Sequence, residues 1–69
     1  MGQESTPSFG SELRRRRLAA GLSLNDLAAQ LHYSKGYLSK IETGSKTAGL
    51  ALARRCDRVL SAQGELLRL

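Results

Sequence analysis

The chain has few aromatic side chains, which limits how its core can be built. Its 69 residues include one phenylalanine, two tyrosines and no tryptophan, so aliphatic side chains must supply most of the buried surface. A chain of this length forms one domain and buries only about 60% of the surface that its unfolded form exposes. The sequence therefore excludes a multidomain enzyme, and its composition suits short helices.

Cysteine and histidine are also scarce. A single cysteine, Cys56, excludes an intramolecular disulfide, and the chain has no Cys-x-x-Cys pair or Cys/His cluster that could hold zinc. The one histidine, His32, has no second ligand beside it, and six scattered acids offer no arrangement for acid–base or nucleophilic catalysis. We therefore expect no enzyme, no cofactor and no metal, and we expect a reducing, cytoplasmic location.

Long apolar runs are missing as well. No segment approaches the ~18 apolar residues of a membrane-spanning helix, and the polar start of the chain lacks the order of a signal peptide. This predicts no membrane partner. Residues 1–7 are small and polar and predict a disordered N-terminal arm, so the folded domain is expected over residues 8–69.

Positive charge is what the chain has in excess. The chain has eleven Lys and Arg residues and six Asp and Glu residues, which gives a net charge of +5. A small domain with this balance is attracted to polyanions such as duplex DNA.

Apolar residues recur at spacings of three and four, and no segment alternates as a strand would. The first such stripe is Phe9, Leu13, Arg17 and Ala20. The spacings predict an all-α bundle of four to five short helices, over residues 9–20, 24–31, 35–42 and 49–60, with a further short helix or turn over 62–68.

The expected helix boundaries carry local signals. Gly21 can take the positive φ that ends a helix, and Gly44 does the same after the third one. Ser23 and Asp26 form the pattern of a capping box, and Ser34 is a good N-cap for the helix over 35–42. These signals place two short helices around a very short connection.

Two short helices joined in this way have the proportions of a helix-turn-helix unit. Such a unit can place its second helix in the major groove of DNA, which is about 12 Å wide and presents base edges. Lys35, Ser39 and Lys40 lie outside the apolar stripe of that helix. We expect them to contact base edges, and a phosphate contact is the alternative for each of them.

The residues resemble a known family at this point. Residues 21–28, 31–34 and 36–44 look like the helix-turn-helix domain of phage Cro and cI repressors, and the likeness covers about residues 9–60. Residues 52–57 and 64–67 further resemble actinobacterial members that carry a larger region after this domain. The resemblance implies a compact lambda-repressor-like bundle, double-stranded DNA as partner, operator binding usually as a homodimer, a further domain beyond Leu69, and no chemistry.

The resemblance also bears on single positions. Gly36 stands where a base-contacting side chain is common, and Leu24 replaces a glutamine that often binds a phosphate. Ser34 and Lys46 are expected at the phosphate backbone. Tyr37 is expected first to pack under the turn, with its hydroxyl within reach of a phosphate.

The run Arg14 to Arg17 turns through about 300° of helix, so its members cannot all face one partner. Arg17 falls on the inward stripe and needs an opposite charge, for which Glu42 is the best candidate. Arg14, Arg15 and Arg16 are expected to point outward, where they serve either as phosphate contacts, Arg14 and Arg15 first, or as a solvated face. Three further arginines, Arg54, Arg55 and Arg58, are expected to serve solubility or contacts at the rim.

Two functions fit these features. The first is sequence-specific DNA binding in transcription regulation; the second is a protein-docking module of the same fold, which has less reason to expose lysines and arginines. At the end of the chain, Leu66, Leu67 and Leu69 need cover, from the domain itself, from a second copy or from a longer chain. We expect a monomer, or a weak dimer formed mainly on DNA.

Overall fold

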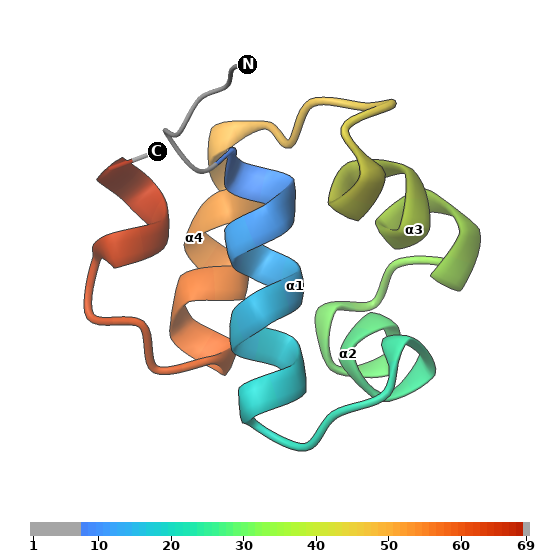
Figure 1. Cartoon of the computed structure of the whole chain (residues 1–69), viewed down its shortest axis with the longest axis horizontal. Coiled ribbons are helices and arrows are strands. Elements are labelled where there is room, and N and C mark those ends of the chain that lie inside the picture. The colour runs from blue at the N-terminus through green and yellow to red at the C-terminus, as the bar shows by residue number, and fades with distance from the viewer. Residues whose placement is uncertain (1–7, 69) are drawn as a thin grey trace, which may run out of the picture.

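The computed structural model describes residues 8–68, so the expected arm over residues 1–7 and the side chain of Leu69 lie outside the described residues. Four α-helices follow one another, α1 (Phe9–Ala19), α2 (Leu24–Leu31), α3 (Lys35–Thr43) and α4 (Leu50–Val59), before a 3₁₀ helix, η1 (Glu65–Arg68) (Figure 1). Residues 8–68 contain no strand, which confirms the all-α class. None of the helices in this range is long and apolar enough to cross a membrane.

The four α-helices begin and end within one residue of the expected bounds. The short helix or turn expected over residues 62–68 consists of a turn followed by the 3₁₀ helix Glu65–Arg68. Ser61, Gln63 and Gly64 have φ values of 51°, 55° and 86°, and a right-handed helix cannot pass through such residues. Asp57 stabilises this turn, since its carboxylate accepts the backbone N–H groups of Gly64 (2.9 Å) and Leu66 (3.2 Å).

Side-chain caps begin the first three helices. The Ser8 hydroxyl accepts the backbone N–H of Ser11, and Ser23 and Asp26 form both hydrogen bonds of a capping box. The Ser23 backbone N–H, donating to Asp26, lowers the pKa of that carboxyl. The fourth helix differs because its N-cap is Gly49, which offers no side-chain hydrogen bond.

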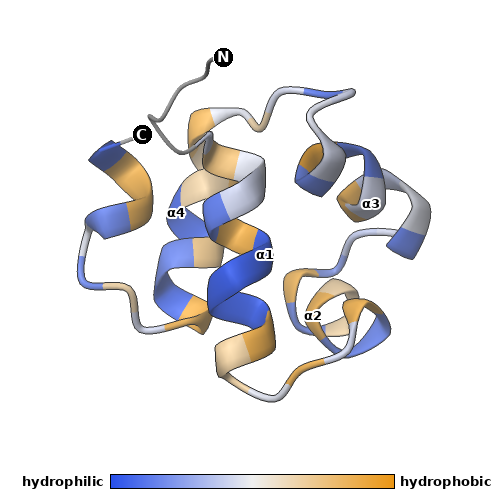
Figure 2. Ribbon diagram, viewed as in Figure 1, coloured by the Kyte–Doolittle hydropathy of each residue, from blue (hydrophilic) through white to orange (hydrophobic). Residues whose placement is uncertain are grey.

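The core lies between the helices and is aliphatic, as the composition requires. Each of α2, α3 and α4 has one apolar side that is buried, whereas α1 is mostly polar (Figure 2). Cys56 is fully buried among these residues, and burial raises the pKa of its thiol to about 11. The fully buried large side chains are Leu13, Leu27, Leu31, Leu38, Ile41, Leu66 and Cys56.

The inward stripe of α1 differs from the expected one at its ends. Ala20 is exposed, because the helix ends before it, and Gly10 is buried in addition to Leu13 and Arg17. A Cβ atom on Gly10 would clash with the carbonyl oxygen of Ile41, near the end of α3. The glycine therefore lets α1 and α3 approach backbone to backbone.

The ion pair expected between Arg17 and Glu42 is present at the same crossing. Arg17 Nε lies 2.7 Å from Glu42 Oε2, Nη2 donates to Oε1 at 3.1 Å, and Nη1 donates to the Leu22 carbonyl at 2.9 Å. The two side chains are only 9% and 5% exposed, and the hydrogen bonds to Glu42 raise the pKa of the Arg17 guanidinium. The pair joins α1 to the last turn of α3 and to the α1–α2 connection.

Candidate nucleic-acid interface

The outward face of α3 collects the expected base-contacting residues. Gly36, Ser39, Lys40 and Thr43 stand at i, i+3, i+4 and i+7, so they share one side of the helix, with Lys35 at its edge. Ser39 is half-buried and the other four are exposed. We call these five residues the α3 outer face. Since α3 has nine residues, it is about 13 Å long. The major groove of DNA, about 12 Å wide, admits one α-helix.

Thr43 is a member of this face that the sequence analysis missed. Its position seven residues after Gly36 is the signal that could have found it. Its hydroxyl donates to the Lys40 carbonyl at 3.3 Å and lies 3.4 Å from the Ser45 hydroxyl. Thr43 therefore extends the polar face to the end of α3.

The first turn of α3 leaves backbone donors open at the surface. The Ser34 hydroxyl oxygen accepts the Tyr37 backbone N–H at 3.1 Å, which leaves the hydroxyl proton able to donate elsewhere. The first turn contains no acidic residue, so nothing there opposes the attraction of the helix N-terminus for anions. No atom lies within 4 Å of where a Cβ on Gly36 would stand; internal packing therefore does not require this glycine.

Two tyrosines and a lysine connect the turn, α3 and the loop after it. The Tyr33 and Tyr37 rings stack with centroids 5.4 Å apart and an interplanar angle of 21°. Lys46 Nζ lies 5.9 Å from the centre of the Tyr37 ring, within the range of a cation–π contact. The structure thus brings Lys46 beside α3, close to Tyr37, although nine residues separate them in the sequence.

The arginines of α1 are divided among three environments. Arg14 is exposed, whereas Arg15 Nε donates to Glu12 at 3.0 Å. Arg16, expected to point outward, is partly exposed (25%), and its Nε donates to Glu12 at 2.9 Å. Glu12 stands four residues before Arg16, so the Arg16 side chain lies along the surface of α1 toward it. Its hydrogen bond from Arg15 also lowers the pKa of the Glu12 carboxyl.

Leu24, at the start of α2, is a packing residue. Leu24 is half-buried and packs against the core cluster. The side chain supports the fold, and it has no group that could bind a phosphate.

The acids of the described segment are mostly engaged inside the domain. Glu12 and Glu42 form ion pairs, and Asp26 and Asp57 accept backbone N–H groups. Within residues 8–68, no carboxylate lies within 4 Å of the side-chain nitrogens of Lys35, Lys40 or Lys46. The positive charge of these lysines is therefore available to an external partner.

A capped helix with a polar outer face, held by α2 and a three-residue connection, defines a helix-turn-helix protein. A family model described as a helix-turn-helix domain matches residues 8–69, and the chain belongs to that family. No curated protein and no solved structure matches the chain. Membership in a helix-turn-helix family indicates DNA binding with a regulatory role.

Proposed function

We propose that this protein binds double-stranded DNA sequence-specifically and regulates transcription as a repressor-like domain of the Cro and cI type. The α3 outer face enters the major groove, where Lys35, Ser39 and Lys40 contact base edges and Gly36 allows close approach. The observation that carries this proposal is the polar, acid-free outer side of a helix whose other side is fixed in the core by buried Leu38 and Ile41.

Phosphate contacts flank the reading helix in this arrangement. Ser34, Tyr37 and Lys46 lie together at the first turn of α3 and the loop after it, as the capping hydrogen bond and the tyrosine–lysine contact support. Arg14 and Arg15 on α1 supply further backbone contacts, and Arg15 shares its guanidinium with Glu12. These groups fix the register of the domain on the duplex.

Two copies would bind neighbouring half-sites of a palindromic operator. Successive major grooves on one side of DNA are about 34 Å apart, and the domain measures 36 × 25 × 23 Å. Two domains side by side along a short axis therefore fit this spacing. Pairing on DNA raises the overall affinity without requiring a stable dimer in solution.

The experiment is a titration of duplex DNA with two matched double variants. Lys35→Gln/Lys40→Gln removes two charges from the α3 outer face, and Arg54→Gln/Arg58→Gln removes two from α4. We expect the lysine variant to lose about tenfold or more in affinity for its preferred site, and the arginine variant to change it about threefold or less. Equal losses in both variants would mean that α3 acts only as part of a general positive charge. Absence of binding at low salt would instead favour the protein-docking module.

A further inference from the structure

The exposed side of α4 carries a second group of cations that DNA reading by α3 does not use. Leu50, Ala51, Arg54, Arg55 and Arg58 are all exposed, whereas the buried residues of α4 lie on its other side. Ideal helix geometry places these five side chains within an arc of about 140°. We call them the α4 outer face.

Charges on this face have no partner inside the described domain. Across residues 8–68, no carboxylate lies within 4 Å of the guanidinium groups of Arg54, Arg55 or Arg58. Three like charges on one side of a helix repel one another. The same face begins with Leu50, whose 61% exposure is the largest among the big apolar residues. Neither feature stabilises the isolated domain.

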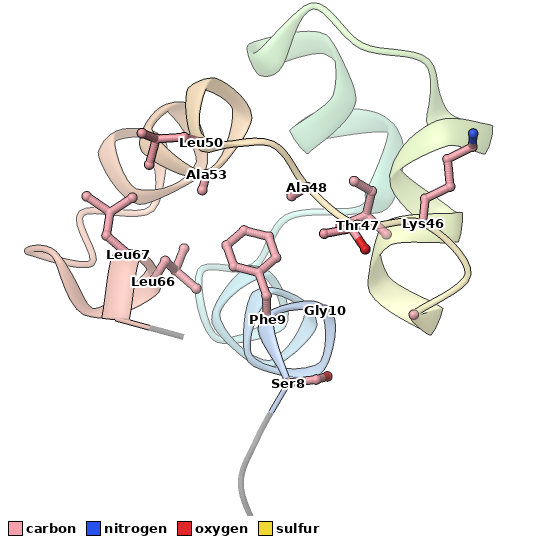
Figure 3. A pocket seen from close by; sticks show the side chains of 12 residues that line it. Ser8, Phe9, Gly10, Lys46, Thr47, Ala48, Leu50, Ala53, Leu66 and Leu67 are labelled. Atoms are coloured by element: carbon pink, nitrogen blue, oxygen red, sulfur yellow. The ribbon is translucent and has the colours of Figure 1, made fainter.

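Leu50 also borders a pocket of about 470 Å³ between the start of α1, the α3–α4 loop, α4 and η1. Figure 3 shows Phe9, Leu50 and Leu67 around one end of it, with Leu66 beneath and Lys46 at the opposite end. Leu67 is 42% exposed here. The pocket is lined mostly by apolar residues at this end, and none of the arginines in residues 8–68 lines it. Leu50 at its rim begins the α4 outer face, with Arg54 one helical turn further along α4.

The chemistry of this combined surface indicates the kind of partner. Arginine, methionine and aromatic residues are enriched at protein interfaces, where lysine is depleted, and the three cations of the α4 outer face are all arginines. A phosphate backbone is charged and would gain nothing from contact with the apolar side chain of Leu50 or with the pocket. A second copy of this chain, at +5, would place arginines against arginines. A guanidinium binds a carboxylate through two parallel hydrogen bonds.

We propose that the α4 outer face and the adjoining pocket bind an acidic segment of another protein. One apolar side chain of that segment fills the pocket beside Leu50 and Leu67. Carboxylates about 6 and 12 Å further along pair with Arg54 and Arg58, which stand four and eight residues after Leu50 on α4. Since α3 and α4 lie on either side of α1 (Figure 1), the partner leaves the α3 outer face open to DNA.

The test uses the 69-residue chain and a synthetic helical peptide of about 15 residues with one leucine and glutamates four and eight positions away. Two control peptides replace the leucine by alanine or both glutamates by glutamine. Fluorescence anisotropy measures the Kd of each. We expect Arg54→Gln/Arg58→Gln and Leu50→Ala each to weaken binding of the complete peptide about tenfold, with Lys35→Gln/Lys40→Gln changing it less than about twofold.

Four results would overturn the proposal. The alanine peptide could bind as tightly as the leucine peptide, which would show simple charge attraction. The lysine variant could lose as much peptide affinity as the arginine variant. Sedimentation could show a dimer that Leu50→Ala dissociates, which would make a second copy the occupant. Finally, Arg54→Gln/Arg58→Gln could lower duplex affinity about tenfold, which would place α4 in the DNA interface.

Discussion

At the scale of single residues, two glycines inside α-helices illustrate opposite uses of a missing side chain. Gly10 in α1 stands against the Ile41 carbonyl, whereas Gly36 in α3 faces open space. A helical glycine costs roughly 0.5–1 kcal/mol relative to alanine. Packing explains why this cost is accepted at Gly10, whereas no packing contact explains it at Gly36.

Gly36→Ala is therefore expected to stabilise the domain and weaken its DNA binding. The unfolding free energy should rise by about 0.5–1 kcal/mol, because alanine favours the helix and its methyl group meets no neighbour. Denaturant unfolding measures the first effect and a duplex titration the second. An unchanged DNA affinity would remove Gly36 from the interface.

Arg17→Met is expected to destabilise the fold without directly removing a DNA contact. It leaves the buried Glu42 carboxylate without its partner, which costs about 3–5 kcal/mol. The double variant Arg17→Met/Glu42→Leu should recover much of that loss, because both charges are then gone. Thermal melts of the single and double variants measure this. If Arg17→Met melted like the wild type but lost DNA binding, Arg17 would belong to the interface.

Cys56 gives a prediction that depends on pH. Burial holds its thiol neutral, with a pKa of about 11 against an ordinary 9.0. Its contribution to stability is complete below pH 9 and is lost as the pH rises toward 11, because the unfolded chain releases its proton first. Wild type should lose more stability than Cys56→Ala over this range. A thiol reagent at pH 8 should react with the denatured chain much faster than with the native one; equal rates would show that Cys56 is accessible.

At the scale of elements, the α1–α3 crossing fixes the reading helix to the rest of the domain. Gly10 permits the close approach of the two backbones. The ion pair between Arg17 on α1 and Glu42 on α3 links the same two helices. We expect Gly10→Ala to lower the unfolding free energy by about 1–3 kcal/mol, since the added methyl group must push the backbones apart. Gly36→Ala is the matched control, with the same chemical change and the opposite sign. A stabilised Gly10→Ala would contradict the close approach of these helices.

Periodicity and caps could predict most of these elements from the sequence. Ser23, Ser34 and Gly44 act through their nearest neighbours in the chain, so their roles are visible in a short window. The role of Gly10 depends on a backbone more than thirty residues away, and no local pattern reveals it. The hydrogen bonds that hold the turn after α4 could not be predicted either, because Asp57 accepts them from the preceding helix.

At the scale of the whole molecule, most acidic side chains pair inside the domain, so the unpaired positive charges determine how it attracts an external partner. Most described acids serve the fold, while the lysines around α3 and the arginines of α4 remain available. We expect duplex affinity to fall steeply with salt. Four to six phosphate contacts in each domain give a slope of log K against log salt of about −4 to −5. A titration that shows no salt dependence would contradict this distribution.

The candidate site could be predicted only in part, and the reason is again distance along the chain. Lys35, Gly36, Ser39 and Lys40 share one helix, so spacing alone places them together. The position of Lys46 beside Tyr37 depends on the path of the loop after α3. The arginine run offers several partners for Glu12, and the structure shows that Arg15 and Arg16 both donate to it. The sequence shows which residue types are present at the candidate site, but their contacts depend on the three-dimensional fold.

The most direct test of the central claim is selection of bound sequences from random duplex DNA by wild type and by Lys40→Ala. If the α3 outer face reads bases, the wild type selects a defined half-site, and Lys40→Ala loses the preference at one position, at a cost of about 1–3 kcal/mol there. Lys46→Ala, a variant of a phosphate contact, should weaken binding and keep the same preferences. Identical preferences for wild type and Lys40→Ala would contradict a reading role for this face of α3.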